Sequence, residues 1–408
     1  MGRAKIKNCT TPTVKHGLRI CRIATVPFFL QNHLHEQICA TVAAGHEVTL
    51  VSSSGPEVSL LTAITGVRFH HIEIPRKISP LRDLLALWKL FKLFRRERYD
   101  IVHSTTPKAG MLTAMAAYLA RVPVRLHTFT GQVWMEKRGV LRYLAKTGDR
   151  VTASLNTQCY ADSFSQREFI IAEQVATSRQ IRVLGAGSLA GVDLQRFNPD
   201  AWVTCKDSIL VELGINPGTK VITFIGRMTK DKGIDELVMA FESLRDSGMD
   251  CVLLLVGPQD TDWDTLSTSV RYTIKNDSGI RCVGYSSEPE RYLAITDIFC
   301  LPSYREGFGN VAIEAAAMEV ATVGTDIVGL RDAIVDRETG LLVPPKDHAA
   351  LAGALAVLMA DEKQRRAMGE KARIRAVAHF DAQRVNAAVA EEYQRLWKCT
   401  TKGIRTNG

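Results

Sequence analysis

The chain has 408 residues, of which 46% are hydrophobic and 23% are charged. This length exceeds what a single hydrophobic core usually supports, so the sequence predicts two domains of about 200 residues each. The composition excludes collagen-like, low-complexity and largely disordered chains.

Charge is distributed unevenly along the chain. Residues 1–200 hold 27 Lys and Arg against 14 Asp and Glu, whereas the remainder holds 25 against 29. A basic first half suits an acidic partner such as a nucleic acid, an anionic membrane surface or a phosphorylated substrate.

The ends and the cysteines indicate the compartment. Residues 1–17 lack the apolar stretch of a secretory signal, and no uncharged apolar run reaches about 18 residues. We therefore expect a cytoplasmic location. The nine cysteines form no C-x-x-C pair, which indicates buried thiols rather than zinc ligands or disulfides.

Short apolar strands alternate with helical segments from LRICRIATV to QIRVLGAGS. This alternation is typical of a parallel sheet covered on both faces. It stops at GVDLQRFNPDAW and restarts with KVITFIGR, which predicts a second domain of the same class. The last forty residues are predicted to be helical throughout and to cross back to the first domain. The predicted organisation is a tail over 1–17, doubly wound α/β domains over 18–200 and 201–378, and a helical segment over 379–408.

Residues 76–98, RKISPLRDLLALWKLFKLFRRER, interleave Leu, Trp and Phe with Lys and Arg. A basic amphipathic helix of this kind can lie on an anionic membrane. The pattern also fits a helix that packs its apolar face on the sheet, because the segment lies between two predicted strands. Both interpretations hold if one end of the helix is exposed.

Two cations follow the first strand of the second domain. In VITFIGRMTKDKG the strand ends at Gly226, and Arg227 and Lys232 lie five residues apart before a helix begins. Doubly wound sheets bind ligands at the carboxyl ends of their strands. Two fixed cations beside a helix amino terminus can hold a diphosphate without a metal ion. A solvated basic turn is the alternative for this stretch alone.

Two glutamates flank a glycine-rich corner in CLPSYREGFGNVAIEA. Gly307 and Gly309 allow backbone N–H groups to point at a ligand, and Asn310 is expected to cap the next helix. Glu314, about one turn into that helix, suits two adjacent ribose hydroxyls, whereas Glu306 in the loop suits a sugar. Taken singly, either glutamate is explained equally well by the helix dipole.

These blocks together resemble a known family. GRMTKDKG, then E-G-F-G-N-x-x-x-E and then GLRDAIVDRETGLLVPPKD are similar to the retaining glycosyltransferases of family 4. The resemblance covers nearly the whole chain and implies the GT-B fold, in which two Rossmann-like domains face a cleft. HSTTPKAGMLTAMAA and RLHTFTGQVW resemble a narrower branch, the bacterial enzymes that extend polyprenyl-diphosphate-linked sugars in capsule, O-antigen and protein-glycan assembly.

The resemblance implies a role for each matching residue. Arg227 and Lys232 would hold the donor diphosphate and stabilise the departing nucleoside diphosphate. Glu306 would contact the donor sugar, and Glu314 would bind the ribose. His127, in VRLHTF, would reach the donor sugar from the first domain, although a lone histidine at a strand end is more often structural. The implied donor-binding positions are Gly226, Gly284, Tyr285, Gly307, Phe308, Gly309, Asn310, Val311 and Glu314.

The narrower resemblance also implies an acceptor and a location. Lys108 and Gly110, in TPKAGM at a predicted helix start, are our candidates for holding the acceptor diphosphate. The enzyme would lie on the cytoplasmic face of the inner membrane, against its anionic surface, and transfer a sugar from a nucleotide-sugar donor to a polyprenyl-diphosphate-linked sugar. An N-acetylhexosamine from UDP is the preferred donor, and a GDP-sugar is the alternative. No cofactor and no metal are expected.

One metal-binding signature, one departure from the family pattern and two alternative functions need to be considered. Asp262 and Asp264, in DWD, match the D-x-D metal signature of unrelated GT-A enzymes, but we expect them to open a helix. The stretch TVPFFLQNHLHEQ lacks the glycines that the family often has after its first strand. The same scaffold also serves nucleotide-sugar epimerases, which hydrolyse rather than transfer. A nucleic-acid partner is not expected, because no known binding motif is present.

Overall fold

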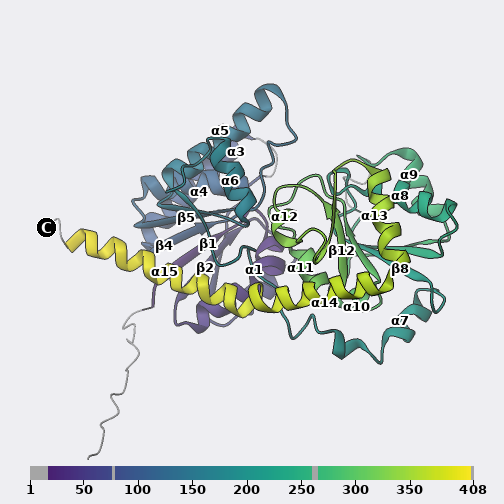
Figure 1. Ribbon diagram of the computed structural model, residues 1–408. Coiled ribbons are helices and arrows are strands. Elements are labelled where there is room, and N and C mark those ends of the chain that lie inside the picture. The colour runs from purple at the N-terminus through teal and green to yellow at the C-terminus, as the bar shows by residue number, and fades with distance from the viewer. Residues whose placement is uncertain (1–16, 76–78, 260–264, 406–408) are drawn as a thin grey trace, which may run out of the picture.

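The computed structural model describes residues 17–75, 79–259 and 265–405, with side chains to residue 401. Within these ranges the chain forms two parallel sheets, each covered by helices on both faces (Figure 1). This arrangement confirms the predicted α/β class with two doubly wound domains. Asp262 and Asp264 lie outside the described residues, and the helix after them begins at Thr268, with Ser267 as its N-cap.

The first sheet has seven strands in the order β3-β2-β1-β4-β5-β6-β7. Helices α3, α4 and α5 lie next to one another on one face, and α1 contacts α2 and α15. The strands are β1 (Arg19–Ile23), β2 (Glu47–Ser52), β3 (Val67–His71), β4 (Ile101–Ser104), β5 (Val124–Phe129), β6 (Gln158–Ala161) and β7 (Ile181–Val183). The helices are α1 (Pro27–Ala43), α2 (Val58–Thr62), α3 (Pro80–Glu97), α4 (Pro107–Leu119), α5 (Gly139–Leu155) and α6 (Phe164–Ala172).

The second sheet has six strands in the order β10-β9-β8-β11-β12-β13, after a connection that contains η1 (Pro199–Trp202) and α7 (Lys206–Glu212). Its strands are β8 (Lys220–Ile225), β9 (Cys251–Val256), β10 (Ile280–Gly284), β11 (Ile298–Leu301), β12 (Ala321–Thr325) and β13 (Gly340–Val343). Its helices are η2 (Lys230–Lys232), α8 (Ile234–Asp246), α9 (Thr268–Asn276), α10 (Pro289–Leu293), α11 (Asn310–Ala317), α12 (Leu330–Ala333), α13 (His348–Ala360) and α14 (Glu362–His379).

In both sheets the strand order reverses beside the first strand, between β1 and β4 and between β8 and β11. Ligands of open parallel sheets bind at such switch points, outside the carboxyl ends of the strands. The fold therefore places two binding edges at the ends of these four strands.

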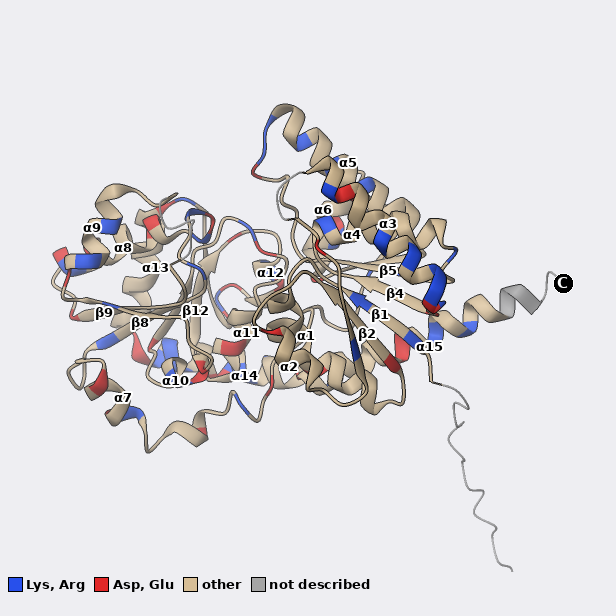
Figure 2. Ribbon diagram, turned by 180° about the vertical axis from the view of Figure 1, so that it is seen from behind, with Lys and Arg blue, Asp and Glu red and all other residues tan. Residues whose placement is uncertain are grey.

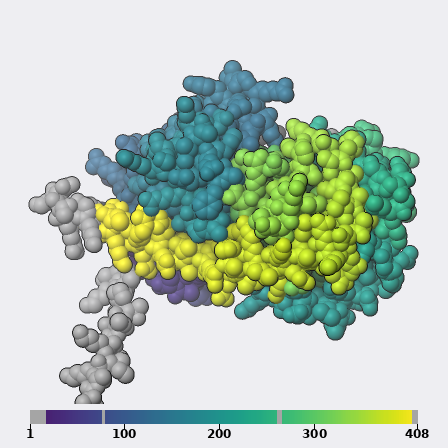
Figure 3. Space-filling view, in the orientation of Figure 1, coloured from purple at the N-terminus to yellow at the C-terminus, as the bar shows by residue number. Residues whose placement is uncertain are grey.

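The last helix, α15 (Ala382–Arg405), crosses back to the first domain, as predicted (Figure 3). The buried Tyr393 hydroxyl accepts a hydrogen bond from Arg22 Nη1 (2.5 Å) and lies 2.8 Å from His103 Nδ1. The prediction that the last forty residues are helical throughout is wrong at Phe380 and Asp381, where the helix is interrupted. Asp381 forms a bridge with Val192 there, because the chain changes domain at this point.

Helix α3 tests only the packing interpretation of the basic amphipathic segment, of which residues 76–78 lie outside the described ranges. Leu90, Leu93 and Phe94, in its second half, are buried in the core. Leu84 and Trp88, nearer its start, are at least half exposed. Ala86, in the first half, is buried in the same core. Packing on the sheet therefore accounts for one face along most of the helix, and contact of the exposed face with a membrane stays a prediction.

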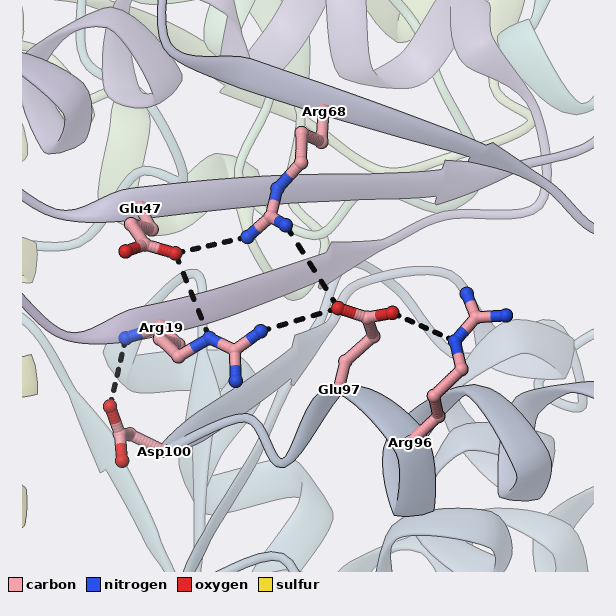
Figure 4. Close-up of polar contacts among 6 residues, drawn as sticks. All are labelled: Arg19, Glu47, Arg68, Arg96, Glu97 and Asp100. Atoms are coloured by element: carbon pink, nitrogen blue, oxygen red, sulfur yellow. Dashed lines mark hydrogen bonds and ion pairs between the residues drawn. The ribbon is translucent and has the colours of Figure 1, made fainter.

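The end of α3 is fixed to the sheet by an ion network at the strand starts (Figure 4). Glu97 lies 3.2 Å from Arg19, 2.8 Å from Arg96 and 3.9 Å from Arg68. The hydrogen bond from Arg96, together with the arginine charges, lowers the pKa of Glu97 although partial burial opposes the shift. Glu97 thus links α3 to two strands.

We expect Glu97→Gln to lower the free energy of unfolding by about 1 kcal/mol at pH 7. Because the folded-state pKa is lowered, this contribution is present above the unfolded-state pKa of about 4.3 and is lost as the pH falls through the folded-state pKa. Urea unfolding at several pH values measures it. Glu73→Gln, at a mostly exposed carboxylate, is the control, and an equal loss at pH 7 and at about pH 3 would contradict the role.

Candidate active site between the two domains

The carboxyl ends of the two sheets meet across short contacts. Ser163, which follows β6, donates a hydrogen bond to the carbonyl of Gly307 (3.0 Å), and Ser165 accepts one from the N–H of Gly329 (2.9 Å). Asp332 of the second domain accepts hydrogen bonds from the first two N–H groups of α6 (3.2 and 3.1 Å). These contacts bring the glycine-rich corner against the first domain.

The predicted cation at the end of η2 contacts the predicted sugar-binding acid. Lys232 Nζ lies 2.5 Å from Glu306 Oε1, which also accepts a hydrogen bond from Ser303 Oγ (2.8 Å). Gly233 follows with φ +72°, and a Cβ there would collide with the carbonyl of Pro302. The turn that carries Lys232 therefore packs directly on the loop that carries Glu306.

Arg227 belongs to the same cluster. The residue is exposed and follows Gly226, which has φ +155°. Burial acts to raise the pKa of Asp231, but the hydrogen bond from Thr229 and the charges of Lys232, Arg227 and Arg305 outweigh it and lower that pKa. Arg305 also lies 3.5 Å from Asp231. The cluster thus holds three cations, Arg227, Lys232 and Arg305, beside the carboxylates of Asp231 and Glu306. The sequence analysis missed Arg305 and Asp231.

Glu314 lies on α11, as predicted, and is half-buried. Burial raises the pKa of Glu314 to about 7, and the charge of Arg196 opposes this rise. Arg196 comes from the connection between the domains, where it pairs with Glu290 (2.8 Å). Ionised Glu314 can accept hydrogen bonds from two hydroxyls. The sequence analysis did not name Arg196, which lies in GVDLQRFNPDAW, where the strand pattern stops.

The glycine-rich corner is closely packed. A Cβ on Gly307 would lie 2.8 Å from the backbone C and O of Thr130 and 3.0 Å from Asp162 Oδ2. The sequence analysis expected Asn310 to cap α11, and this prediction is wrong. Gly309, with φ +89°, occupies the cap position. The Asn310 side chain instead accepts a hydrogen bond from Ser188 Oγ (2.9 Å).

Two more positions of this corner are hydrophobic. Phe308 is buried, with its ring 5.1 Å from that of Phe380, and Val311 is half-buried. Only their backbone groups are therefore suited to a ligand. Asp162, across the boundary, is a buried carboxyl whose pKa burial raises to about 8. Its Oδ1 has no hydrogen-bond partner among the described residues.

His127 is held rigidly at the end of β5. Its Nδ1 lies 2.9 Å from Ser104 Oγ, and burial lowers the pKa of His127 to about 3, so the ring is neutral. A Cβ on Gly110 would lie 2.7 Å from His127 Nδ1. Gly110 therefore allows α4 to approach the imidazole. Lys108 is paired with Asp83 of α3 (2.7 Å), and its acceptor role stays a prediction.

Gly284 is the last residue of β10, and Tyr285 follows it. Gly284 has φ +79°, and Tyr285 is 57% exposed. The Tyr285 hydroxyl lies 3.4 Å from Asn32 Oδ1, and its ring is 6.4 Å from that of Phe28. The sequence analysis noted only that TVPFFLQNHLHEQ lacks glycine and did not name Phe28 or Asn32, which lie on α1, a helix that begins at Pro27.

Comparisons of the sequence with known proteins show the family of this chain. The profile of the family Glycosyl transferases group 1 matches residues 206–375, and that of the glycosyl transferase 4-like domain matches residues 30–187. The capsular polysaccharide biosynthesis glycosyltransferase CapM of Staphylococcus aureus is 31% identical over 86% of this chain and 90% of its own length. An Escherichia coli UDP-Gal:alpha-D-GlcNAc-diphosphoundecaprenol alpha-1,3-galactosyltransferase is 26% identical over 75% of this chain and 78% of its own.

Solved structures share the fold. A glycosyltransferase from Rickettsia africae has a TM-score of 0.78 at 21% identity, covering 94% of this chain and 99% of that one. Anabaena HepE in complex with UDP-glucose has a TM-score of 0.77 at 17% identity, covering 93% and 100%. The two family profiles match residues in both domains. The chain therefore belongs to the glycosyl transferases of group 1, with the GT-B fold, and is a glycosyltransferase.

Proposed function

We propose that this enzyme transfers a sugar, preferably an N-acetylhexosamine from a UDP-sugar, to an undecaprenyl-diphosphate-linked sugar in surface polysaccharide biosynthesis, with retention of anomeric configuration. The observation that carries this proposal is the Lys232–Glu306 pair beside Arg227. The names of the two curated relatives support the acceptor and the pathway class.

The proposed chemistry follows from the charges at the site. The bond between the anomeric carbon and the diphosphate oxygen breaks, and negative charge develops on the leaving diphosphate, where Arg227 and Lys232 stabilise it. The acceptor hydroxyl attacks the same face and gives its proton to the departing phosphate oxygen. Glu306 orients the sugar, and Glu314 accepts hydrogen bonds from the ribose. The two fixed cations supply the charge that a divalent metal supplies in other enzymes.

A sugar-nucleotide consumption assay tests this function. Purified protein is given UDP- and GDP-sugars, membranes and excess EDTA, and chromatography identifies the donor consumed. We expect loss of one UDP-N-acetylhexosamine, with label entering the lipid fraction. Label appearing only as free sugar or as an epimer would replace the proposal with the hydrolase or epimerase alternative, and loss of activity in EDTA would refute the metal-free mechanism.

The first domain has a surface suited to the anionic membrane that holds such an acceptor. Among the described residues no helix is long and apolar enough to span a bilayer. Helices α3 and α5 instead expose apolar side chains near their starts, and Figure 2 shows Lys and Arg along α3. The exposed apolar residues are Leu81, Leu84, Leu85, Trp88, Val140, Leu141, Tyr143 and Leu144. The exposed cations beside them are Arg82, Lys89, Lys92, Lys137 and Arg138.

The position of this surface fits the acceptor. Helices that follow parallel strands begin near the carboxyl ends of those strands, and α4 lies between α3 and α5. The exposed apolar residues therefore lie on the same side as Lys108, at the start of α4. A lipid-linked acceptor held in the membrane would present its diphosphate near that edge of the sheet.

We expect the double variant Leu84→Glu, Leu141→Glu to bind anionic vesicles about 100-fold less tightly, because two apolar contacts are lost and two negative charges are added. Vesicle co-sedimentation measures the change. Val211→Glu, at an exposed apolar residue of α7, is the matched control and should bind as the wild type does. Equal binding by all three proteins would place the membrane contact elsewhere.

A further inference from the structure

The turn between β6 and α6, residues 162–165, joins the first domain to the second. Residues 163–165 hydrogen-bond to the glycine-rich corner and to the start of α12. Helix α6 accordingly lies against α12 across the boundary (Figures 1 and 2). Asp162 begins this turn and carries its one ionisable side chain. A change in the charge of Asp162 therefore acts at the contact between the domains.

The Asp162 side chain faces the second domain from inside the boundary. Its Oδ2 atom lies 3.0 Å from the position that a Cβ on Gly307 would occupy. The backbone of Asp162 is fixed on both sides, because its N–H donates to Gln166 Oε1 (2.7 Å) and its carbonyl accepts from the N–H of Ser188 (2.7 Å). Asp162 is 6% exposed. The carboxyl group is thus held against Gly307 and away from water.

This carboxyl lacks the partners that a buried charge requires. Among the described residues Asp162 Oδ1 has no hydrogen-bond partner, and the same is true of Nε2 of the buried Gln166. The residues that meet Asp162 from neighbouring segments, Ser188 and Gly307, are uncharged. Burying an ionised carboxylate without a partner is costly. The closed boundary therefore favours a neutral Asp162.

The nearest charged residues of the second domain are engaged elsewhere. Asp332 accepts hydrogen bonds from the first N–H groups of α6, and Glu306 is paired with Lys232. Burial alone raises the pKa of Asp162 to about 8, with no charged group contributing. The protonation state of Asp162 thus depends on whether Gly307 covers it.

We propose that Asp162 is a positioning residue whose carboxyl makes closure of the domain boundary depend on pH. While Gly307 covers the carboxyl it keeps its proton. When the domains separate, water reaches the carboxyl, and the proton passes to the solvent. This inference goes beyond the proposed donor and acceptor, because it concerns the boundary itself and applies to whichever sugar the enzyme transfers.

Closure is then linked to proton uptake. In an open boundary Asp162 would have an ordinary pKa of about 3.9, whereas in the closed boundary its pKa is about 8. Between these values the closed state binds more protons than the open state. The equilibrium constant for closure therefore falls about tenfold per pH unit as the pH rises through this window, and it is constant above about pH 8.

Small-angle X-ray scattering of the full chain between about pH 5 and about pH 9 measures closure as the radius of gyration. We expect the radius of the wild type to increase with pH and to level off above about pH 8. Asp162→Asn is neutral at every pH and should keep the low-pH radius throughout. Asp162→Ala, which also removes the carboxyl, should do the same, and thermal unfolding checks that both variants are folded.

Asp149→Asn is the matched control. Asp149 is also 6% exposed, and burial raises its pKa to about 7. Its carboxylate accepts a hydrogen bond from Trp134 Nε1 (2.7 Å) within the first domain, away from the contacts with the second. Asp149→Asn should therefore show the same dependence of the radius of gyration on pH as the wild type.

The pH dependence of turnover provides a second measurement. If donor and acceptor react in the closed state, kcat/KM of Asp162→Asn relative to the wild type should rise by up to about tenfold per pH unit between about pH 5 and about pH 8. A radius of gyration that is independent of pH in the wild type, or that changes equally in Asp162→Asn, would overturn the role of Asp162. Failure to consume any UDP-sugar would contradict the proposed function and leave the scattering result unaffected.

Discussion

Lys232→Ala and Arg227→Ala are each expected to lower kcat by about 100- to 1,000-fold, the size of effect seen when one group that stabilises developing charge is removed. In the proposed mechanism the leaving diphosphate gains charge beside both cations, so their contribution would grow in the transition state. Lys232→Ala also leaves Glu306 without its 2.5 Å partner. Steady-state kinetics with a saturating donor measure the change in kcat.

The control for this prediction is on the same turn. Lys230 is exposed and belongs to η2, so Lys230→Ala removes a positive charge without touching the diphosphate and should change kcat less than threefold. Glu314→Ala should instead raise the donor KM about tenfold with a smaller change in kcat. In the proposal Glu314 binds the ribose equally in the ground state and in the transition state. If the cation variants and Lys230→Ala had the same small effect, the assignment of the leaving-group site would be wrong.

Gly307→Ala is expected to lower kcat/KM by about 100-fold or more, although it adds only one methyl group. That methyl would lie 2.8 Å from the backbone of Thr130 and 3.0 Å from Asp162. Both belong to the first domain, and backbone cannot rotate away as a flexible side chain can. The domains must then separate at the boundary where we propose that donor and acceptor meet, and a small misplacement of reacting groups is costly.

A second glycine provides the comparison. A Cβ on Gly353, in α13, would meet no atom within 4 Å, so Gly353→Ala should leave kcat/KM unchanged. Thermal unfolding distinguishes separated domains from a damaged fold, since Gly307→Ala should lose little stability if the domains simply move apart. Normal turnover by Gly307→Ala would show that activity does not require the close contact between Gly307 and the first domain.

The sequence was informative wherever the signal was local. Apolar strands and helix starts predicted two doubly wound domains. The cations after β8 and the glutamates around the glycine corner could be proposed as site residues because the members of each pair lie within eight residues of one another. Asn310 was misplaced by one position, because a glycine with positive φ can cap a helix as well as an asparagine side chain can.

What the sequence could not provide was the partner across the boundary. Ser163 and Gly307 are separated by 144 positions, and no periodicity links them. The same holds for Arg196, whose charge acts on Glu314 from the connection between the domains. Such pairs depend on how one domain is turned against the other, which is decided by long-range packing, including that of α15 on the first domain.

The most direct test of the central claim follows the sugar itself. The enzyme, in excess EDTA, is given each labelled UDP- and GDP-sugar with a polyprenyl-diphosphate-linked sugar in anionic vesicles, and the anomeric configuration of the product is determined by NMR. The account predicts that one UDP-N-acetylhexosamine labels the lipid-linked product with its α configuration retained, and that Lys232→Ala nearly abolishes this transfer. Label released as free sugar, or a product of inverted configuration, would contradict it.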